Sequence, residues 1–398
     1  MKVLFLVPRV PYPLEKGDKL RAYLHAQRLS REHELHLVCL SEGTPSPGTE
    51  EQLRSICTEL TILKLKRPLI LWSLFKGLFS SKPFQVHYFF QGHLKRRLKK
   101  QIETDPPDRI YCQLIRTSEY VKEFHGIPKT LDYMDAFSKG LERRIERTPF
   151  PVNILIKEES RRTTLYENLS YEYFDQHIII SDQDRRSIPH PSRPKIHVLP
   201  NGIDTGFYSP QEAEKDQDIL FTGNMAYPPN IESACYLVQK VLPLLEKEGV
   251  QPRTLLAGVS PTRRVRELES ERVEVSGWMK DIRRAYGRSK IFIAPMIMGS
   301  GLQNKLLEAM AMGLPCITTP LANEALGAPE ERVILVGRTE QGLAEQLMKL
   351  FRDSSLRERL AAEGRRFVTE HYDLQRIGDR LEGILRSSKE DQEPERTI

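Results

Sequence analysis

Short apolar runs alternate with helical patterns through the first half of the chain. The opening run KVLFLV is apolar after its lysine, as expected of a strand buried on both faces. The next segment places Leu20 and Leu24 about one helical turn apart, and ELHLVCL then returns to a strand pattern. This alternation is typical of parallel βαβ units. The predicted strands of this half cover residues 2–7, 34–40, 109–112, 129–133, 177–181 and 195–199.

A second series of the same kind follows the turn-rich segment LPNGIDTGFYSPQEAEKDQ at 199–217. The alternation of strands and helices resumes there with a similar spacing, so the chain is predicted to be an α/β protein with two doubly wound halves. The predicted strands cover 218–223, 253–259, 271–277, 290–296, 314–319 and 331–336, and the predicted helices between them cover 230–248, 279–289, 303–312 and 340–351.

These patterns divide the chain into five segments. The first is a Rossmann-like domain over residues 1–200, followed by a linker at 201–217 and a second Rossmann-like domain at 218–353. Helical segments at 354–387 are expected to pack back toward the N-terminal domain. The polar tail at 388–398 is predicted to be disordered, because it contains too little apolar surface to bury.

Composition narrows the class of protein. A chain of 398 residues with 39% hydrophobic and 29% charged residues is typical of a soluble protein of two or three domains. The net charge of +6 is too small to favour a nucleic-acid partner. The N-terminus lacks the features of a signal peptide, and the apolar stretch at 68–79 is too short to span a bilayer. We therefore expect a cytoplasmic protein, at most peripheral at the inner face of the plasma membrane.

The cysteines and histidines do not suggest a metal centre. Five cysteines are scattered without a CxxC pair, which indicates buried, reduced thiols. The His, Asp and Glu residues show no spacing typical of ligands, so we expect neither a structural nor a catalytic metal.

The segment MGSGLQNKLLEAMAMGLPC at 298–316 carries the strongest candidate chemistry. It follows a predicted strand, and ligands of open α/β sheets bind beyond the carboxyl ends of strands. Gly299 and Gly301 would let backbone N–H groups approach a ligand, and a helix N-terminus followed by Lys305 suits a phosphate. Glu308, one turn further, suits a pair of sugar hydroxyls. Helical spacing places Lys305, Glu308 and Met312 away from the buried stripe, and an ordinary solvated helix face is the alternative interpretation.

Two other nucleotide-binding motifs are absent. The first strand is followed by PRVPYPLEKGDKLR, without GxGxxG, and no GxxxxGK[ST] pattern occurs in the chain. A dinucleotide cofactor and a Walker-type nucleotide site are therefore disfavoured.

Four motifs in order along the chain carry a family resemblance. They are YPLEKGDKLR (12–21), LPNGIDTGFYSP (199–210), FTGNMAYPPNIES (221–233) and GSGLQNKLLEAMAMGLPCITT (299–319). In these motifs the chain resembles bacterial glycosyltransferases of family 4, which have the GT-B fold of two Rossmann-like domains facing across a cleft. It is particularly similar to sugar transferases associated with exopolysaccharide and exosortase systems.

The resemblance implies a nucleotide-diphosphate sugar as the donor, held mainly by the C-terminal domain, and retention of the anomeric configuration. It implies no cofactor and no catalytic metal. The diphosphate would lie against Gly299, Ser300, Gly301, Leu302 and Lys305, and Glu308 would hold the donor ribose. The facing loop would contribute Gly223 and Asn224, and Gly17 would approach the phosphates from the N-terminal domain.

The chain departs from the family pattern at two places. Ser300 stands where the first of two family glutamates is expected. Many relatives carry basic residues after the glycine of the FTG motif, but Met225–Asn230 contains no charge. More of the phosphate charge would then be neutralised by Lys305, with Lys16, Lys19 or Arg21 as helpers from the N-terminal domain.

The first domain offers candidate acceptor-binding carboxylates in TLDYMDAFSKG at 130–140. Asp132 and Asp135 lie at the end of a predicted strand, where they would contact acceptor hydroxyls or assist proton transfer. An equally simple interpretation is a turn at the strand end with aspartates that cap a helix.

The segment from Thr61 to Ile102 predicts contact with an anionic membrane surface. It contains ten Lys and Arg residues, no acidic residue and several aromatic residues. The alternative is a solvated basic face around a few core aromatics.

Together with these residues, the family resemblance implies a hexosyltransferase that acts on a nucleotide sugar and a glycan or polyprenyl-linked acceptor in surface polysaccharide biosynthesis. Lys305, Glu308 and Asp135 are the predicted catalytic residues. The main alternative is a non-catalytic GT-B subunit of a polysaccharide assembly complex, which the missing first glutamate favours. A nucleotide-sugar epimerase on the same fold is a weaker alternative.

Overall fold

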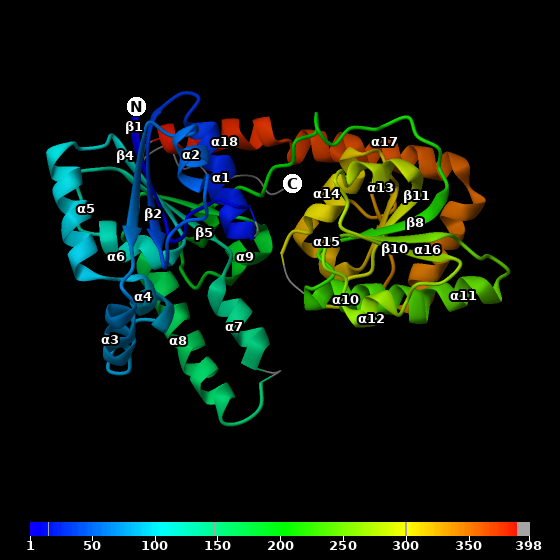
Figure 1. Cartoon of the computed structure of the whole chain (residues 1–398), viewed down its shortest axis with the longest axis horizontal. Helices are drawn as coiled ribbons and strands as arrows, with labels where there is room; N and C mark the ends of the chain where they lie inside the picture. Colours follow the sequence, from blue (N-terminus) through cyan, green and yellow to red (C-terminus); the bar gives the residue numbers. More distant parts are fainter. Residues whose placement is uncertain (15, 146–147, 299–300, 388–398) are drawn as a thin grey trace. The chain divides into compact units, whose positions relative to one another are not determined.

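The computed structural model describes residues 1–14, 16–145, 148–298 and 301–387. The chain forms two compact units (Figure 1). The first contains Met1–Pro200 and the residues from Gly378 onward, and the second contains Asn201–Ile377. Each unit has a separate apolar core, because buried side chains cluster around each sheet independently.

The first unit is built on a parallel sheet. Within the described residues its seven strands lie in the order β3-β2-β1-β4-β5-β6-β7. β3 was not predicted, because its sequence ELTILK alternates polar and apolar residues at the edge of the sheet. The strands are β1 (Lys2–Val7), β2 (Glu34–Ser41), β3 (Glu59–Lys64), β4 (Arg109–Gln113), β5 (Lys129–Met134), β6 (Gln176–Ile179) and β7 (His197–Val198).

Helices connect these strands, as the βαβ pattern requires. Figure 1 shows α3, α7 and α8 projecting together beyond one end of the first sheet. The helices of this unit are α1 (Gly17–Leu29), α2 (Thr49–Arg54), α3 (Arg67–Gly77), α4 (Phe84–Phe89), α5 (Gly92–Thr104), α6 (Ser118–Val121), α7 (Phe137–Ile145), α8 (Val152–Tyr171) and α9 (Asp182–Ser187), with short 3₁₀ turns η1 (Ile115–Thr117) and η2 (Arg193–Lys195).

The second unit repeats the architecture. In its described part, six parallel strands lie in the order β10-β9-β8-β11-β12-β13. All of them fall within the strand segments predicted from the sequence or extend them by one residue. The strands are β8 (Gln217–Thr222), β9 (Thr254–Ala257), β10 (Val273–Gly277), β11 (Ser289–Ala294), β12 (Cys316–Thr318) and β13 (Leu335–Val336).

The long helix predicted at 230–248 is interrupted by a π-helical turn. Pro243 lacks an N–H and cannot continue a regular α-helical ladder, so the chain widens into the π segment before the helix resumes. The helices of the second unit are α10 (Pro228–Tyr236), the π segment η3 (Leu237–Val241), α11 (Leu242–Lys247), α12 (Arg263–Arg266), α13 (Arg283–Arg288), α14 (Asn304–Ala311), α15 (Pro320–Leu326), α16 (Glu340–Arg352) and α17 (Ser354–His371).

The C-terminal helical region differs from the prediction for 354–387. α17 packs against α14 and α16 of the second unit, and Gly364 on α17 lies close to Met310. Only the part of α18 (Leu374–Arg386) from Gly378 onward belongs to the first unit, where Arg28 pairs with Asp379 at 3.0 Å. The expected linker at 201–217 likewise lies in the second unit. The predicted tail at 388–398 lies outside the described residues.

The strand order sets the place where a ligand can bind. In each sheet the order reverses direction once, between β1 and β4 in the first unit and between β8 and β11 in the second. At such a switch point the connections leave toward opposite sides and open a crevice at the carboxyl ends of the strands. The predicted site residues of both units lie at these ends. None of the helices in the described ranges is long and apolar enough to cross a membrane.

Candidate functional site

Two glycines bring backbone and side chains together at the carboxyl ends of β8 and β9. A Cβ atom on Gly258 would lie 1.8 Å from the carbonyl oxygen of Gly223, so these two loops can approach only because glycine is present. A Cβ atom on Gly223 would in turn lie 2.6 Å from Nδ2 of Asn230 and 3.1 Å from Nζ of Lys305. The predicted residue Gly223 therefore lies beside Lys305. Gly258 was not predicted, although it directly follows the apolar strand run RTLLA.

Lys305 is a buried cation with neutral neighbours. Its side chain is on the first turns of α14, and the residue is 9% exposed. Nζ donates to Oδ1 of Asn230 at 2.5 Å and lies 4.5 Å from the centre of the Phe221 ring. Among the described residues no carboxylate lies within 4.0 Å of Nζ. Burial lowers the pKa of Lys305 to about 7, although the nearby Glu308 carboxylate opposes this shift.

Asn230 joins the lysine to the facing loop. Its Nδ2 donates to the backbone oxygen of Asn224 at 2.9 Å, while its Oδ1 accepts from Lys305. The side chain of Asn224 is exposed and accepts a hydrogen bond from the N–H of Ala226 at 2.9 Å. The structure thus brings Gly223, Asn224 and Lys305 into one cluster, as the sequence predicted. Asn230 was not predicted, because an asparagine in FTGNMAYPPNIES carries no distinctive signal.

Glu308 lies one turn further along α14 and is oriented by hydroxyl groups. Its Oε2 accepts from the Tyr286 hydroxyl at 2.7 Å, and the Tyr208 hydroxyl also donates to it. Oγ1 of Thr222 lies 2.9 Å from the Tyr286 hydroxyl and donates to it, because the tyrosine proton is already directed at Glu308. Burial raises the pKa of Glu308, and the hydrogen bond from Tyr286 opposes the rise. A contact of Glu308 with a ribose stays a prediction.

The loop before α14 is described only in part. Gly299 and Ser300 lie outside the described residues. Gly301 has a φ of +84°, a left-handed conformation that favours glycine, and its carbonyl accepts from Nε2 of Gln303 at 3.1 Å. Leu302 is half-buried against the core of the second unit. Among the described residues no side-chain hydrogen bond caps α14. The N–H of Leu306 donates to the carbonyl of Gln303 at 2.9 Å, which leaves the N–H groups of the two preceding helical residues for a ligand.

The predicted exposure of one face of α14 is wrong. Lys305, Glu308 and Met312 were expected to face away from the buried stripe, yet Lys305 and Met312 are buried and Glu308 is half-buried. The reason is that α14 contacts β11, β12 and α17, so it is enclosed on more than one side. Because this face is buried, water cannot stabilise the charge of Lys305.

In the first unit the structure contradicts the predicted role of Arg21. The residue is 1% exposed, and its guanidinium forms a bidentate pair with Asp132, at 2.6 Å from Nε to Oδ2 and 3.1 Å from Nη2 to Oδ1. The Tyr111 hydroxyl donates to the same carboxylate at 3.2 Å and lies 2.7 Å from Nδ1 of His25. The Arg21 guanidinium and the Asp132 carboxylate are therefore paired in the interior, and neither can reach a phosphate or an acceptor.

Asp135, directly after β5, is a better candidate. Its Oδ1 is buried and has no hydrogen-bond partner among the described residues. Burial and the nearby Asp184 carboxylate raise the pKa of Asp135 to about 6, and Arg116 opposes the rise. Met134, which precedes Asp135, has a φ of 66°, as does Leu114 at the end of β4. Such backbone strain in residues other than glycine is concentrated at functional sites.

Arg116 supplies the positive charge near this edge. Its guanidinium lies 4.6 Å from the centre of the Phe137 ring and 5.2 Å from that of Phe89, and Nε donates to Gln85 at 3.1 Å. Burial and the neighbouring Arg9 lower the pKa of Arg116 to about 10. Sequence reasoning did not identify Arg116, because only the fold brings its loop beside Asp135.

Gly17 is the first residue of α1 and is exposed. A Cβ atom on it would lie 3.7 Å from Cε of Met134, an ordinary contact, so nothing among the described residues of the first unit requires glycine at this position. Its approach to donor phosphates stays a prediction.

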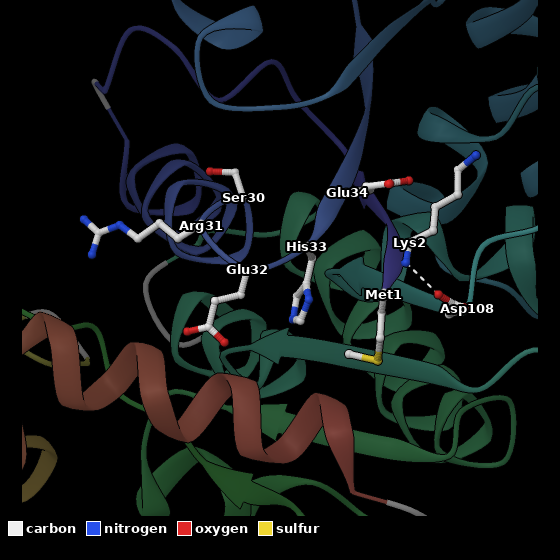
Figure 2. A pocket seen from close by; sticks show the side chains of 8 residues that line it. All are labelled: Met1, Lys2, Ser30, Arg31, Glu32, His33, Glu34 and Asp108. Atoms are coloured by element: carbon white, nitrogen blue, oxygen red, sulfur yellow. Dashed lines mark hydrogen bonds between the residues drawn. The ribbon is translucent and has the colours of Figure 1, made fainter.

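The first unit also has a hollow at the opposite edge of the sheet. It has a volume of about 510 Å³, and Figure 2 shows the side chains that surround it. Lys2 donates its backbone N–H to Asp108 at 2.6 Å, and Nε2 of His33 lies 2.6 Å from Oε2 of Glu382. These groups are paired, and they lie near the beginnings of β1 and β2 rather than at the carboxyl ends where ligands bind. The hollow is therefore a poor candidate for the functional site.

A family model matches most of the second unit of the chain. Residues 216–353, which include Gly223, Lys305 and Glu308, match the family model described as glycosyl transferases group 1. An uncharacterized 44.6 kDa protein in the cps region of Klebsiella pneumoniae is 22% identical over 402 residues, which cover 94% of this chain and 97% of that protein. A putative glycosyltransferase EpsF of Bacillus subtilis (strain 168) is 28% identical over 153 residues, or 34% of this chain and 39% of EpsF.

Solved structures share the fold over almost the whole chain. The Anabaena protein Alr3699/HepE, determined in complex with UDP, has a TM-score of 0.67 and 13% identity and covers 97% of this chain and 99% of its own. The chain therefore has the GT-B fold, and residues 216–353 of its second unit match the model of glycosyl transferases group 1. The resemblance expected from the four sequence motifs is confirmed.

Proposed function

We propose that the protein is a glycosyltransferase that moves a hexose-type sugar from a nucleotide-diphosphate sugar to a glycan acceptor. The observation that carries this proposal is Lys305, a buried ammonium group without a carboxylate partner among the described residues, at the switch point of the second sheet. A buried charge is costly unless an opposite charge neutralises it, so the site favours an anionic ligand. A diphosphate fits this requirement, and the related HepE structure contains UDP.

The leaving group would be stabilised by preorganised donors. As the bond from the sugar to the diphosphate breaks, negative charge grows on the diphosphate oxygens. The ammonium of Lys305 and the first N–H groups of α14 would stabilise this charge without a metal ion or another cofactor. Glu308, held by Tyr286 and Tyr208, would accept hydrogen bonds from the donor ribose. The family resemblance further implies retention of the anomeric configuration.

The acceptor would bind at the carboxyl edge of the first sheet. Asp135 has a pKa of about 6, so near neutral pH its carboxylate can take the proton of an acceptor hydroxyl. Arg116 is suited to a negatively charged part of the acceptor, such as the phosphate of a polyprenyl-linked glycan. Together with the motifs shared with exopolysaccharide-associated sugar transferases, these groups favour a role in surface polysaccharide biosynthesis at the cytoplasmic side of the plasma membrane.

A donor and acceptor assay tests the proposal. The purified protein is incubated with UDP-, GDP- and ADP-linked sugars and a polyprenyl-linked glycan in the presence of EDTA, and the anomeric configuration of the product is read by proton NMR. We expect sugar transfer with retention. Activity that disappears with EDTA and returns with Mg²⁺ would contradict the metal-free mechanism, and an inverted product would contradict retention.

The Asp135→Asn variant separates catalysis from binding. If the carboxylate acts as a base, kcat should fall by about 10²–10⁴ while the affinity for the nucleoside diphosphate is unchanged. Lys247→Gln, which changes an exposed charge of the second unit, is the control. A protein that binds nucleotide but turns over no donor would favour the alternative of a non-catalytic GT-B subunit, for which Ser300 in place of the first family glutamate is the supporting observation.

A further inference from the structure

The exposed face of α3 is strongly apolar. Trp72 is 55% exposed and Phe79, just beyond the helix, is 83% exposed, and Leu71, Phe75 and Leu78 are also exposed. Trp72 stacks on Phe75 with ring centres 5.8 Å apart, and Phe75 contacts Phe79 at the same separation. Large apolar side chains that contact one another at the surface of a unit with its own core mark an interaction site.

A second exposed apolar cluster begins α8. Phe150 is 77% exposed, and Val152, Ile154 and Leu155 of the first helical turn are exposed as well. This turn is apolar on several sides, which is unusual for a helix end that faces water. The sequence analysis did not include this cluster in the predicted membrane segment.

The fold places the two clusters on one face of the first unit. Nη1 of Arg162 on α8 donates to the carbonyl of Gly77 at the end of α3 at 2.6 Å, and its guanidinium lies 5.1 Å from the Phe84 ring. Leu155 is seven residues before Arg162 on the same helix, or about 10 Å along its axis. Figure 1 shows the free ends of α3 and of the α7–α8 hairpin projecting together from the sheet.

The surroundings of this apolar face are positively charged. The segment from Thr61 to Ile102 has no acidic residue, and α7 adds Lys139, Arg143 and Arg144. The carboxylates that α7 and α8 contribute nearby are already engaged. Glu142 pairs with Lys139. Glu158 pairs with Arg161 and Arg162. Glu159 accepts hydrogen bonds from the N–H groups of Phe84 and Gln85.

A basic pocket of about 400 Å³ lies beside the apolar face, between α3, α4 and α5. Trp72, Lys76, Lys82, His93 and Arg96 line it, and Nζ of Lys76 lies 5.2 Å from the centre of the Trp72 ring. Its one lining carboxylate, Glu119, is held by Lys82 at 2.8 Å and by the Tyr166 hydroxyl at 2.8 Å. The pocket suits a phosphate whose attached chain is apolar.

We infer that α3 and the beginning of α8 insert into the surface of an anionic phospholipid bilayer, with lipid phosphates in the basic pocket. An apolar tip surrounded by Lys and Arg combines the two contributions that hold proteins at such a surface, burial of aromatic side chains and attraction to anionic headgroups. A second copy of the chain is a poorer occupant, because two faces with the same excess of positive charge repel each other.

The structure also shows which basic residues line the pocket beside Trp72. Three consecutive basic residues of the 61–102 segment, Lys95, Arg96 and Arg97, lie on α5. Lys95, however, pairs with Glu123 at 2.6 Å, and Arg97 lines a different hollow with His36 and Glu59. Of these three residues only Arg96 lines the pocket beside Trp72, so Lys76 and Arg96 are the residues to change.

Vesicle flotation tests the inference. The protein should float with vesicles of phosphatidylglycerol and phosphatidylcholine at low salt, and less at high salt. Lys76→Ala/Arg96→Ala should weaken binding about 25-fold, since each basic residue contributes about fivefold. Phe75→Ser/Leu155→Ser should reduce binding while leaving its salt dependence. Lys240→Ala/Lys247→Ala, on exposed positions of the second unit, is the matched control and should bind normally.

The two tryptophans of the chain provide a direct readout. In Trp278→Phe the emission comes from Trp72 alone, and it should shift to shorter wavelength when anionic vesicles are added. In Trp72→Phe the emission comes from Trp278, which is 68% exposed in the second unit, and it should not change.

Three results would overturn the inference: no flotation at low salt, equal binding to purely zwitterionic vesicles, or a Trp72 emission that vesicles leave unchanged. A dimer seen by sedimentation and removed by Phe75→Ser/Leu155→Ser would instead assign the face to a second copy. Vesicle binding needs no sugar donor, so the inference and the proposed activity can fail separately.

Discussion

Arg21 in the first unit and Lys305 in the second are both buried cations near the switch point of a sheet, but their surroundings differ. Arg21 is held in a bidentate pair by Asp132, which also accepts from Tyr111. Among the described residues, Nζ of Lys305 contacts the amide oxygen of Asn230, the face of Phe221 and the sulfur of Met296, and the Glu308 carboxylate lies beyond ion-pair distance. A buried charge that is fully paired maintains the fold, whereas one that is left uncompensated is available to a ligand.

The largest expected effect is the loss of stability when Arg21, the paired cation, is replaced. Arg21→Met leaves the Asp132 carboxylate buried without its partner, so the variant should lose about 3–5 kcal/mol of stability in the first unit. Calorimetry should show this as a lower Tm for the transition of that unit. The double variant Arg21→Met/Asp132→Leu should recover most of the loss, because no unpaired charge is left. A single variant as stable as the wild type would mean that the pair does not hold the fold.

Lys305→Met should weaken ligand binding without lowering the stability of the protein. Affinity for a nucleoside diphosphate should fall about 10- to 100-fold, the contribution of one charge-assisted hydrogen bond, while the affinity for the nucleoside alone is unchanged. The Tm of the free protein should not fall, because an uncompensated buried charge has been removed. Isothermal titration calorimetry with UDP, GDP and ADP measures the first effect. Lys290→Met, at an exposed pair with Asp218, serves as the control.

The pH dependence of binding should distinguish the two cations further. The folded-state pKa of Lys305 is about 7, below its ordinary value of 10.5, so the free protein loses this charge as the pH rises through 7. A bound diphosphate favours the charged form. Affinity should therefore fall about tenfold per pH unit above 7, until the pKa of the complex is reached. Lys305→Met should abolish this dependence, and a flat profile in the wild type would count against Lys305 as the diphosphate ligand.

The lowered pKa of Lys305 also makes the stability of the protein depend on pH. Because the unfolded chain binds a proton at this lysine between about pH 7 and pH 10.5 and the folded chain does not, the contribution of Lys305 to stability increases as the pH rises through that window. The difference in Tm between wild type and Lys305→Met should accordingly shrink from pH 7 to pH 9.

The smallest expected effect is on diphosphate binding, when the space beside Lys305 is filled by a substitution at Gly223. A methyl group at Gly223 would approach Asn230 and displace its side chain, so Gly223→Ala should weaken diphosphate binding several-fold. Gly249→Ala, at a turn where a Cβ atom meets nothing within 4 Å, controls for the general effect of adding a methyl group at a glycine with positive φ. Equal affinities in the two variants would show that the contact between Gly223 and Asn230 is unimportant.

Much of the fold could be predicted because its signals are local. The apolar runs of β1, β2 and β11 are long, as expected of central parallel strands. β3 was missed because an edge strand with alternating polar residues resembles a loop in sequence. The packing of α17 was assigned to the wrong unit, because an amphipathic helix does not indicate which surface it covers.

The candidate site was predicted only where strand, glycine loop and helix follow one another directly. Gly223, Gly301, Lys305 and Glu308 lie in such segments. Asn230 and Tyr286 were missed, since their importance comes from contacts with Lys305 and Glu308, which are 75 and 22 residues away in the chain. Arg21 was misassigned for the same reason, because its partner Asp132 is 111 residues away.

By itself the sequence determined most of the strands, the two α/β halves and the helix that carries Lys305 and Glu308, since hydrophobic periodicity and glycine placement act over a few neighbouring residues. Only the tertiary structure decided which cation is neutralised and which is free for a ligand, and which exposed helix ends share one face. The electrostatic state of a buried group depends on every charge and dipole around it, and those groups are brought together by folding from distant parts of the chain.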